Sequence, residues 1–306
     1  MRPHDLDPAT LHTLLVVARV GTFDAAAAAL FVTPSAVSQR IKALESKVGQ
    51  VLITRTKPAE PTDAGRVLIR LASQWEVLGR EAMSELVAEE GDDDPVSMAL
   101  VANADSLATW LLPALARVQR SRNVVFELLR EDERHSADLL RHGTVLGAVT
   151  SDPTPVQGCR VVELGAMRYL PVASPDFVRR WLSEGFEPVG LAKAPMISFD
   201  RKDTLQSEVL RAVCGSGVTP PAVFVPASRD FDDAVRLGMG WGMLPEAWIQ
   251  ESLASGDLVS LSESCARSIG LYWQHWALAS PLLEAVTDAV VSQGRESLTH
   301  GGKLRE

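Results

Sequence analysis

The sequence lacks long hydrophobic segments. None of its apolar runs approaches the ~18 to 20 residues that a membrane-spanning helix requires. The N-terminal stretch MRPHDLDPAT also lacks the hydrophobic region of a secretory signal peptide. We therefore expect a cytoplasmic protein that has no membrane partner.

Cysteine is scarce. The chain of 306 residues has three cysteines, Cys159, Cys214 and Cys265, which are far apart in the sequence. Their odd number and wide spacing argue against a disulfide framework and match no zinc-binding motif. We expect reduced thiols, no metal site and no cofactor.

Recognisable catalytic motifs are missing as well. The sequence has no G-x-S-x-G motif, no P-loop and no G-x-G-x-x-G motif behind a strand. The glycine-rich segments 215–217 and 238–242 lack the framework of a phosphate-binding loop. His135, His142 and Cys159 form no obvious dyad, so the pattern argues against an enzyme.

Excess basic charge is absent from the chain as a whole, whose formal net charge is −9. Residues 19–70, however, hold 8 Lys and Arg against 4 Asp and Glu, whereas residues 91–306 hold 20 against 28. A basic region of this size is sufficient for a DNA contact, because affinity comes from local neutralisation of phosphates. A random fluctuation of surface charge would give the same count.

Three short helices are predicted at the N-terminus. Asp7 and Pro8 form a helix start, and Gly21 can end that helix. An alanine-rich helix follows over residues 23–30, and a third helix runs from Pro34 to about Val48. Two helices joined by a short turn, the second polar and basic, are typical of a helix-turn-helix. The alternative is an ordinary three-helix bundle.

The third helix carries polar residues on its outer faces. A recognition helix needs short polar side chains near its N-terminus to reach base edges, and its first amides can meet phosphates. The residues in these positions are Ser35, Ser38, Gln39, Arg40 and Lys42. In the alternative bundle, they would form a solvated face.

A hairpin is predicted after this helix. Residues 51–55 read as an apolar strand, and residues 56–61 would return the chain with Arg55 and Lys57 at the tip. Such a wing supplies phosphate or minor-groove contacts beside the recognition helix.

A long helix is predicted from Thr62 and Asp63 to about Glu90. Its apolar residues recur at 4-3-4-3-4 spacing, which is typical of a dimer-forming helix. These residues are Ala64, Leu68, Leu71, Trp75, Leu78 and Ala82. Packing against its own domain is the alternative. The acidic segment 89–95, closed by a proline, reads as a domain linker.

The rest of the chain alternates strands and helices, which predicts an α/β fold of two lobes with mainly parallel sheets. The predicted strands are Val96–Val101, Val124–Leu128, Gly147–Thr150, Tyr169–Ala173, Met196–Phe199, Val223–Val225, Gly240–Leu244 and Ile269–Gln274. The predicted helices are Leu107–Gln119, Ala137–His142, Asp176–Glu184, Thr204–Val213, Phe231–Leu237 and Leu282–Leu298.

Residues 23–65 read FDAAAAALFVTPSAVSQRIKALESKVGQVLITRTKPAEPTDAG. This segment resembles the LysR-type transcriptional regulators. The stretches GQVLITRTKP, NADSLATW and FDRKD resemble the ArgP/LysG branch of that family, which responds to basic amino acids.

The resemblance implies a winged helix-turn-helix over residues 1–61, a linker helix over 62–94, and a regulatory domain like type 2 periplasmic binding proteins over 95–306. Lobe I would comprise about 95–164 and 267–306, and lobe II about 165–266. It further implies a homodimer, extended to a tetramer, that binds promoter DNA and meets RNA polymerase. A lysine or arginine effector would control transcription, with an amino-acid exporter gene as the target.

The resemblance also places specific residues at the DNA. Carried over by position are Pro34, Ser35, Ser38 and Gln39 on the recognition helix and Arg55 in the wing. We further expect phosphate contacts from Arg40, Lys42 and Lys57. The dimer helix would use Leu68, Leu71, Trp75 and Leu78.

A basic amino acid needs acidic partners for its cations, because an unpaired buried charge is costly. Its carboxylate needs hydroxyls, helix amides or an arginine. Candidates that follow the predicted strands are Asn103, Asp105, Ser106, Thr109, Trp110, Thr150, Ser151, Phe199, Asp200, Arg201, Asp203 and Asp230. We expect Asp105 and Asp203 to bind the cations, and Ser106 and Thr150 the carboxylate.

Each of these residues has a structural alternative. Asp and Ser commonly cap helices, Asp200 and Asp203 can be loop acids, and Trp110 can be core. For the whole chain, a different effector, a solute-binding protein and an enzyme are the alternative functions.

Overall fold

The computed structural model describes residues 6–86, 95–131 and 136–299. The chain forms two compact units. The first comprises Met1–Ala102, Leu115–Val161 and Trp273–Asp288, and the second comprises Asn103–Ala114, Val162–Tyr272 and Ala289–Glu306. The domain boundaries expected from the sequence stay a prediction.

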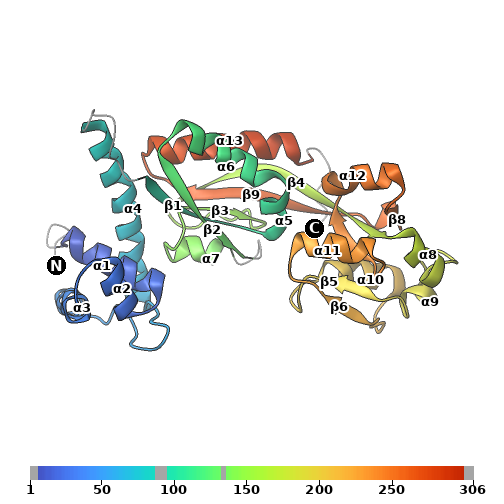
Figure 1. Cartoon of the computed structure of the whole chain (residues 1–306), viewed down its shortest axis with the longest axis horizontal. Coiled ribbons are helices and arrows are strands. Elements are labelled where there is room, and N and C mark those ends of the chain that lie inside the picture. Colours follow the sequence, from blue (N-terminus) through green and yellow to red (C-terminus); the bar gives the residue numbers. More distant parts are fainter. Residues whose placement is uncertain (1–5, 87–94, 132–135, 300–306) are drawn as a thin grey trace. The chain divides into compact units, whose positions relative to one another are not determined.

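The first unit begins with three helices (Figure 1), and each of them starts at a side-chain cap. They are α1 (Pro8–Val20), α2 (Phe23–Ala29) and α3 (Pro34–Val48). The cap residues Asp7, Thr22 and Thr33 accept hydrogen bonds from backbone N–H groups of the first turns. All three helices agree with the predicted ranges to within a residue or two.

The three helices share one hydrophobic core. Leu14 of α1 and the inner face of α3, formed by Val37, Ile41 and Leu44, are fully or almost fully buried. Ala26 of α2 is buried in the same core, where its small side chain allows close helix packing. The N-terminal region therefore has an apolar interior that leaves the other face of α3 to solvent.

The segment after α3 forms a narrow hairpin with less regular structure than the sequence predicted. Residues 51–55 do not form a strand; Ile53 and Pro61 make an isolated antiparallel bridge. Thr54 N–H donates to Glu60 O at 2.7 Å, and Thr62 N–H donates to Leu52 O at 3.0 Å. The two prolines at 58 and 61 explain the short ladder, because proline has no N–H to donate.

The helix α4 (Asp63–Leu86) follows and packs against α1. Its middle and C-terminal parts also contact later parts of the first unit. Glu81 accepts hydrogen bonds from Ser280 Oγ at 2.7 Å and from Leu282 N–H at 2.9 Å, and Ser73 Oγ donates to Gly143 O at 3.2 Å. The expected helix end near Glu90 and the acidic linker lie outside the described residues.

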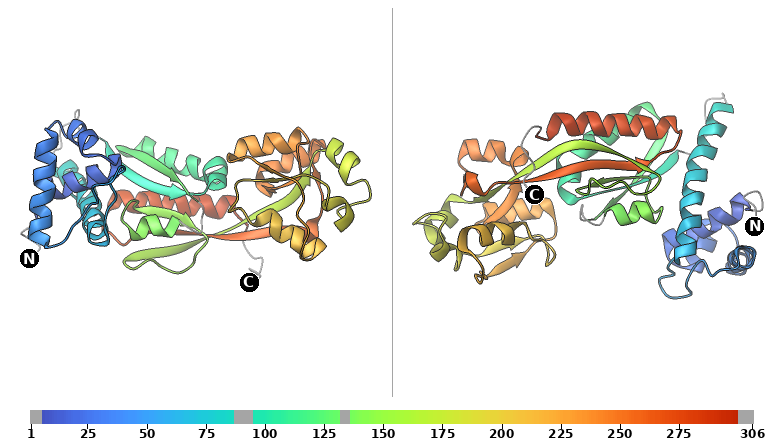
Figure 2. Two further views of the ribbon diagram at one scale, coloured as in Figure 1. Left: turned by 90° about the horizontal axis from the view of Figure 1, so that it is seen from below. Right: turned by 180° about the vertical axis from the view of Figure 1, so that it is seen from behind.

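The rest of the first unit is an α/β layer. Its strands are β1 (Val96–Ala102), β2 (Val124–Arg130), β3 (Gly147–Thr150), and parts of β4 (Cys159–Ala173) and β9 (Arg267–Trp276). β1 pairs in parallel with both β2 and β3. The helices α6 (Leu112–Ser121) and α13 (Pro281–Ser297) cover one face, and α7 (Ser136–Arg141) covers the other (Figure 2).

Gly147 permits a close approach between β3 and β9. A Cβ atom there would lie 2.2 Å from Trp273, which is fully buried. The indole Nε1 of Trp273 donates to Thr287 Oγ1 at 3.1 Å. Because Gly147 has no side chain, the Trp273 ring fits against it, and the indole N–H of Trp273 still has a hydrogen-bond acceptor.

The second unit is built around the C-terminal part of β4, which pairs antiparallel with β7 (Gly242–Pro245) and β8 (Val259–Ser260). A separate parallel pair joins β5 (Met196–Ser198) and β6 (Ala222–Phe224). The helices are α5 (Ala104–Ser106), the π-helical turn η2 (Leu107–Leu111), α8 (Pro175–Trp181), α9 (Pro188–Leu191), α10 (Leu205–Cys214), α11 (Ser228–Arg236) and α12 (Glu246–Ser255).

The expected strands and helices of the α/β region are found close to their predicted positions. The elements predicted from the sequence do not include β8, α9, α12 or the first part of β4. The single predicted helix 107–119 is part of a longer helical segment from Ala104 to Ser121 that includes η2.

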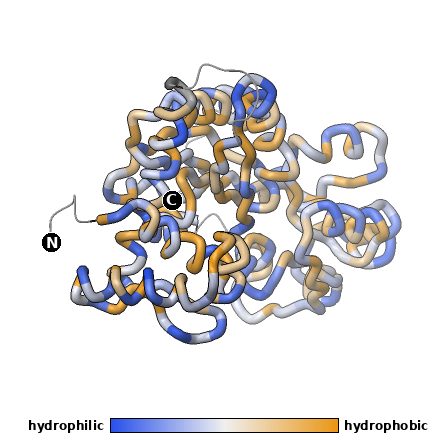
Figure 3. The backbone as a smooth tube through the Cα atoms, turned by 60° about the vertical axis from the view of Figure 1, so that its left-hand side comes forward, coloured by the Kyte–Doolittle hydropathy of each residue, from blue (hydrophilic) through white to orange (hydrophobic). Residues whose placement is uncertain are grey.

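Hydrophobic and hydrophilic residues are interleaved along the chain (Figure 3). Within the described residues, no helix is long and apolar enough to cross a membrane. The three cysteines are partly buried and form no disulfide.

Candidate functional site

The outer face of α3 is accessible near its N-terminus. Pro34, Ser35, Gln39 and Lys42 are exposed, and Ser38 is partly buried. The cap by Thr33, whose Oγ1 accepts from Ala36 N–H at 3.2 Å, fixes where the helix starts. The predicted recognition helix therefore exists and presents most of the predicted side chains to solvent.

Arg40 differs from the other predicted DNA residues. It is partly buried, and its guanidinium donates to Thr13 Oγ1 of α1 at 3.3 Å. Arg40 therefore joins α3 to α1 in the free protein.

The two basic residues of the hairpin have different surroundings. The guanidinium of Arg55 lies 5.0 Å from the centre of the Phe23 ring and 3.9 Å from the Glu45 carboxylate. Lys57 is exposed. Arg55 is exposed in the loop between the paired residues Thr54 and Glu60, and its guanidinium contacts α2 and α3.

The long helix α4 has an exposed apolar stripe. Leu71, Trp75 and Leu78 lie on it, and Trp75 is 54% exposed. Leu68, which the heptad spacing assigned to the same seam, is only 7% exposed and packs in the N-terminal core. Val67, one turn before Leu71, is exposed instead.

Asp105 is the central residue of the second unit's polar cluster. Its carboxylate accepts hydrogen bonds from Tyr169 Oη at 2.8 Å and from Ser228 Oγ at 2.7 Å. α5, β4 and α11 each contribute one of the three residues. Among the described residues, no Lys, Arg or His forms an ion pair with this carboxylate.

Burial raises the pKa of Asp105 above its ordinary value, and the two hydroxyl donors oppose that shift. The pKa direction shows that desolvation outweighs the hydrogen bonds. A nearby cation would reverse this balance.

The residues next to Asp105 in the sequence have two kinds of surroundings. One of them caps a helix, and another has a buried polar atom without a hydrogen-bond partner among the described residues. Asn103 Oδ1 accepts from Ser106 N–H at 3.0 Å, which caps α5. The hydroxyl oxygen of Ser106 is fully buried and has no hydrogen-bond partner in the described part of the chain. Thr109 Oγ1 donates to Asp105 O at 2.6 Å. The Ser106 hydroxyl is therefore a group that could pair with a ligand.

In the acidic loop after β5, the carboxylates accept hydrogen bonds from backbone N–H groups in and next to the loop. Asp203 accepts from Phe199 N–H at 2.9 Å and from Leu205 N–H at 3.0 Å. Asp200 accepts from the N–H groups of residues 202 and 203. The guanidinium of Arg201 lies 5.0 Å from the centre of the Phe224 ring. These contacts give Asp200 and Asp203 turn-forming roles.

The hydrogen bonds of the Asp105 carboxylate involve none of the remaining predicted effector residues. Thr150 and Ser151 belong to the first unit, where Thr150 is buried and its Oγ1 accepts from Asp152 N–H at 3.1 Å. Asp230 is exposed in the first turn of α11.

Sequence reasoning missed Tyr169 and Ser228. Tyr169 was predicted to lie on a strand but was given no role. Ser228 is the first residue of a helix whose start was placed at residue 231. The β4–α5 and α11–α5 contacts join residues 64 and 123 positions apart, and no local pattern reports such pairs.

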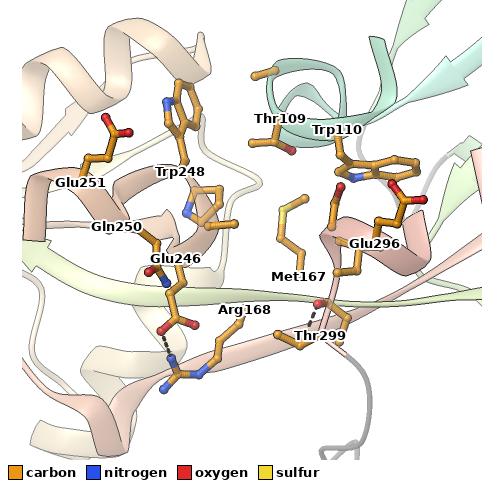
Figure 4. A pocket seen from close by; sticks show the side chains of 16 residues that line it. Thr109, Trp110, Met167, Arg168, Glu246, Trp248, Gln250, Glu251, Glu296 and Thr299 are labelled. Carbon is orange, nitrogen blue, oxygen red and sulfur yellow. Dashed lines mark hydrogen bonds and ion pairs between the residues drawn. The ribbon is translucent and has the colours of Figure 1, made fainter. Parts of the chain in front are cut away.

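A pocket of about 660 Å³ lies elsewhere in the second unit (Figure 4). Trp110 and Trp248 lie on different sides of it, and Arg168 pairs with Glu246 at 2.6 Å. Trp110 is buried, and its indole N–H has no acceptor among the described residues. Its neighbour Thr109 also lines this pocket.

Family comparisons assign both halves of the chain. Residues 8–66 match the bacterial regulatory helix-turn-helix of the lysR family, and residues 95–295 match the LysR substrate binding domain. The chain belongs to the LysR family of transcriptional regulators. The relatives of this LysR-type regulator are named regulators, which confirms the expectation that it is not an enzyme.

Several relatives cover nearly the whole regulator. The transcriptional regulator LysG of Mycobacterium tuberculosis is 45% identical over 93% of this chain and 92% of its own. The lysine export transcriptional regulatory protein LysG of Corynebacterium efficiens is 45% identical over 96% and 99%. ArgP of Yersinia enterocolitica is 40% identical over 95% and 98%. The resemblance to the ArgP/LysG branch is confirmed.

Solved structures confirm the fold of this LysR-type regulator. The crystal structure of ArgP from Mycobacterium tuberculosis matches with a TM-score of 0.84 and 44% identity, covering 97% of this chain and 100% of that one. Full-length LysG from Corynebacterium glutamicum, with the effector Arg bound, matches with a TM-score of 0.77 and 39% identity, covering 96% and 100%.

Proposed function

We propose that this LysR-type regulator senses a basic amino acid, arginine or lysine, and controls transcription of an amino-acid exporter gene. The observation that carries the proposal is the buried Asp105 carboxylate, which has two hydroxyl donors and no cationic partner among the described residues. Related regulators support it, since one LysG structure holds arginine and other relatives are named for lysine export.

The chemistry of the Asp105 cluster suits a cation. Tyr169 and Ser228 hold the carboxylate in place, and each of its oxygens keeps acceptor capacity. An ammonium or guanidinium group would supply the missing positive charge and form charge-assisted hydrogen bonds. The buried hydroxyl of Ser106 is the nearest additional group along the chain for pairing with a polar atom of the effector. Asp203 is a weaker candidate, because its carboxylate already accepts two backbone N–H groups.

DNA binding is assigned to the exposed N-terminal face of α3 and to the hairpin beside it. Ser35, Ser38 and Gln39 would reach base edges, with Lys42 and Lys57 at phosphates. Pro34 offers an apolar contact, and Arg55 a phosphate contact once it leaves Glu45. Arg40 reaches a phosphate only if it releases Thr13.

Self-association is assigned to the exposed stripe of α4. Leu71, Trp75 and Leu78 would form the seam of a dimer, and Leu68 would support it from the N-terminal core. Pairs of dimers would form a tetramer on promoter DNA, where the regulator meets RNA polymerase. We place it in the cytoplasm, since its promoter DNA lies there.

Calorimetry with the full-length protein tests the effector assignment. We expect arginine or lysine to bind, and citrulline, which has arginine's shape and α-ammonium group but a neutral side chain, to bind much more weakly. Asp105→Asn removes the charge and should weaken binding about tenfold or more. Asp176→Asn, at an exposed acid of α8 that pairs with Arg179, is the matched control and should bind normally. Equal binding by Asp105→Asn and the wild type would contradict the proposal.

A further inference from the structure

One hydrophobic side chain of the DNA-binding domain is almost completely exposed. Phe31 lies in the turn between α2 and α3 and is 96% exposed, the highest value of any large hydrophobic residue in the described chain. Apolar surface in water is unfavourable, so this ring costs free energy in the isolated protein.

The backbone at Phe31 is unfavourable as well. Its φ of 53° makes it the one non-glycine residue with positive φ in the described chain. Phe31 N–H donates to Ala28 O at 3.3 Å, and Val32 N–H donates to Ala27 O at 3.0 Å. This is the pattern of a Schellman motif, in which glycine usually occupies the position that Phe31 takes. A bulky residue there is strained.

The ring stands next to the DNA-facing surface. Two residues later, Thr33 caps α3, and the exposed Pro34 and Ser35 follow. α2, α3 and the turn that joins them lie together in the N-terminal domain (Figure 1). The strain and the exposure therefore occur where a partner of known chemistry, the edge of a DNA groove, would arrive.

We propose that the Phe31 ring contacts the C5 methyl group of a thymine at the edge of the major groove that α3 enters. A phenyl ring has no hydrogen-bond donor or acceptor, so it cannot pair with a phosphate. The thymine methyl is the apolar group that DNA presents in the major groove. Phe31 is thus a specificity residue that selects thymine at one position of each half-site. The inference rests on the DNA binding of the proposed function.

The test starts from a duplex that the wild-type protein selects from a random pool. Phe31→Gly, which suits the positive φ, should bind this duplex about tenfold more weakly, while its thermal midpoint is unchanged or higher. The dependence of affinity on salt should stay the same, because no phosphate contact is lost. Phe31→Leu should keep most of the affinity. Val189→Ala removes another exposed apolar side chain, 74% exposed and in the second unit, and should bind like the wild type.

Replacing thymines of the duplex by uracil, one at a time, tests the contact without relying on a variant's stability. We expect one uracil position in each half-site to weaken the wild type, and the same position to leave Phe31→Gly unaffected. Equal affinities of Phe31→Gly and the wild type, or equal uracil effects in both, would overturn the inference. Specific binding of the selected duplex by the wild type would still support the regulator function itself.

Discussion

At the scale of single residues, Asp105 shows how a buried acid is kept in a fold without a counter-charge. Each of its oxygens accepts one hydrogen bond from a neutral hydroxyl, but these bonds do not restore the hydration that burial removes. We therefore expect the free regulator to be less stable than a variant with a neutral residue there. A cationic effector relieves this cost, which links ligand binding to stability.

The burial of Asp105 predicts an unusual dependence of stability on pH. The raised pKa of Asp105 means that the folded protein holds a proton that the unfolded chain releases, so ionisation lowers the free energy of unfolding as pH rises above the ordinary carboxyl value. Asp105→Asn lacks this loss. We expect it to be more stable than the wild type near pH 7, with the gap closing toward about pH 4.

Thermal unfolding of both proteins without effector, across that range of pH, measures the effect. Asp176→Asn serves again as the control and should follow the wild-type curve. A constant difference between Asp105→Asn and the wild type at every pH would show that ionisation of Asp105 does not matter.

The residues that form the candidate effector site were predictable from the sequence only in part. Asp105, Asp200 and Asp203 all follow apolar strands, and nothing local distinguishes them. The structure does, because Asp203 and Asp200 are used by nearby backbone N–H groups, whereas Asp105 meets side chains from distant elements. Tyr169 and Ser228 could not be found from the sequence because their role depends on those distant contacts.

At the scale of elements, α4 has two different faces. One face carries Leu68 into the N-terminal core, and the other leaves Leu71, Trp75 and Leu78 exposed. A helix that is apolar on two faces needs a second partner, and the heptad-like spacing fits another copy of α4. Glu81 and Ser73 meanwhile tie α4 to the regulatory part of the first unit.

Trp75→Glu should disrupt self-association. A carboxylate in the middle of the apolar stripe would be buried without a partner in the dimer, at a cost of several kcal/mol. We expect analytical ultracentrifugation to show a smaller species than the wild type at the same concentration. Gln74→Glu adds the same charge beside the stripe and should keep the wild-type assembly. Unchanged assembly of Trp75→Glu would remove the stripe from the interface.

Elements with strong local signals were predictable. The caps Asp7, Thr22 and Thr33, each followed by helical apolar spacing, fixed α1 to α3 closely. The wing strand failed because Pro58 and Pro61 limit the ladder to one bridge. The exposed Trp75 of α4 agrees with the heptad spacing, whereas Leu68 is buried in the N-terminal core, a contact that the spacing alone does not reveal.

At the scale of the whole molecule, regulation requires that the effector binds two states of the regulator unequally. The family assignment supplies the two functions, DNA binding in residues 8–66 and effector binding in residues 95–295. The central claim is that a basic amino acid at Asp105 changes how the N-terminal domains engage the promoter.

Footprinting of the full-length protein on the promoter of its target gene, with and without arginine or lysine, tests this claim most directly. We predict that one of these amino acids changes the protected region and the transcript level for the wild type, and that Asp105→Asn shows neither change while still binding the DNA. Identical footprints and transcription with and without both amino acids would contradict the account.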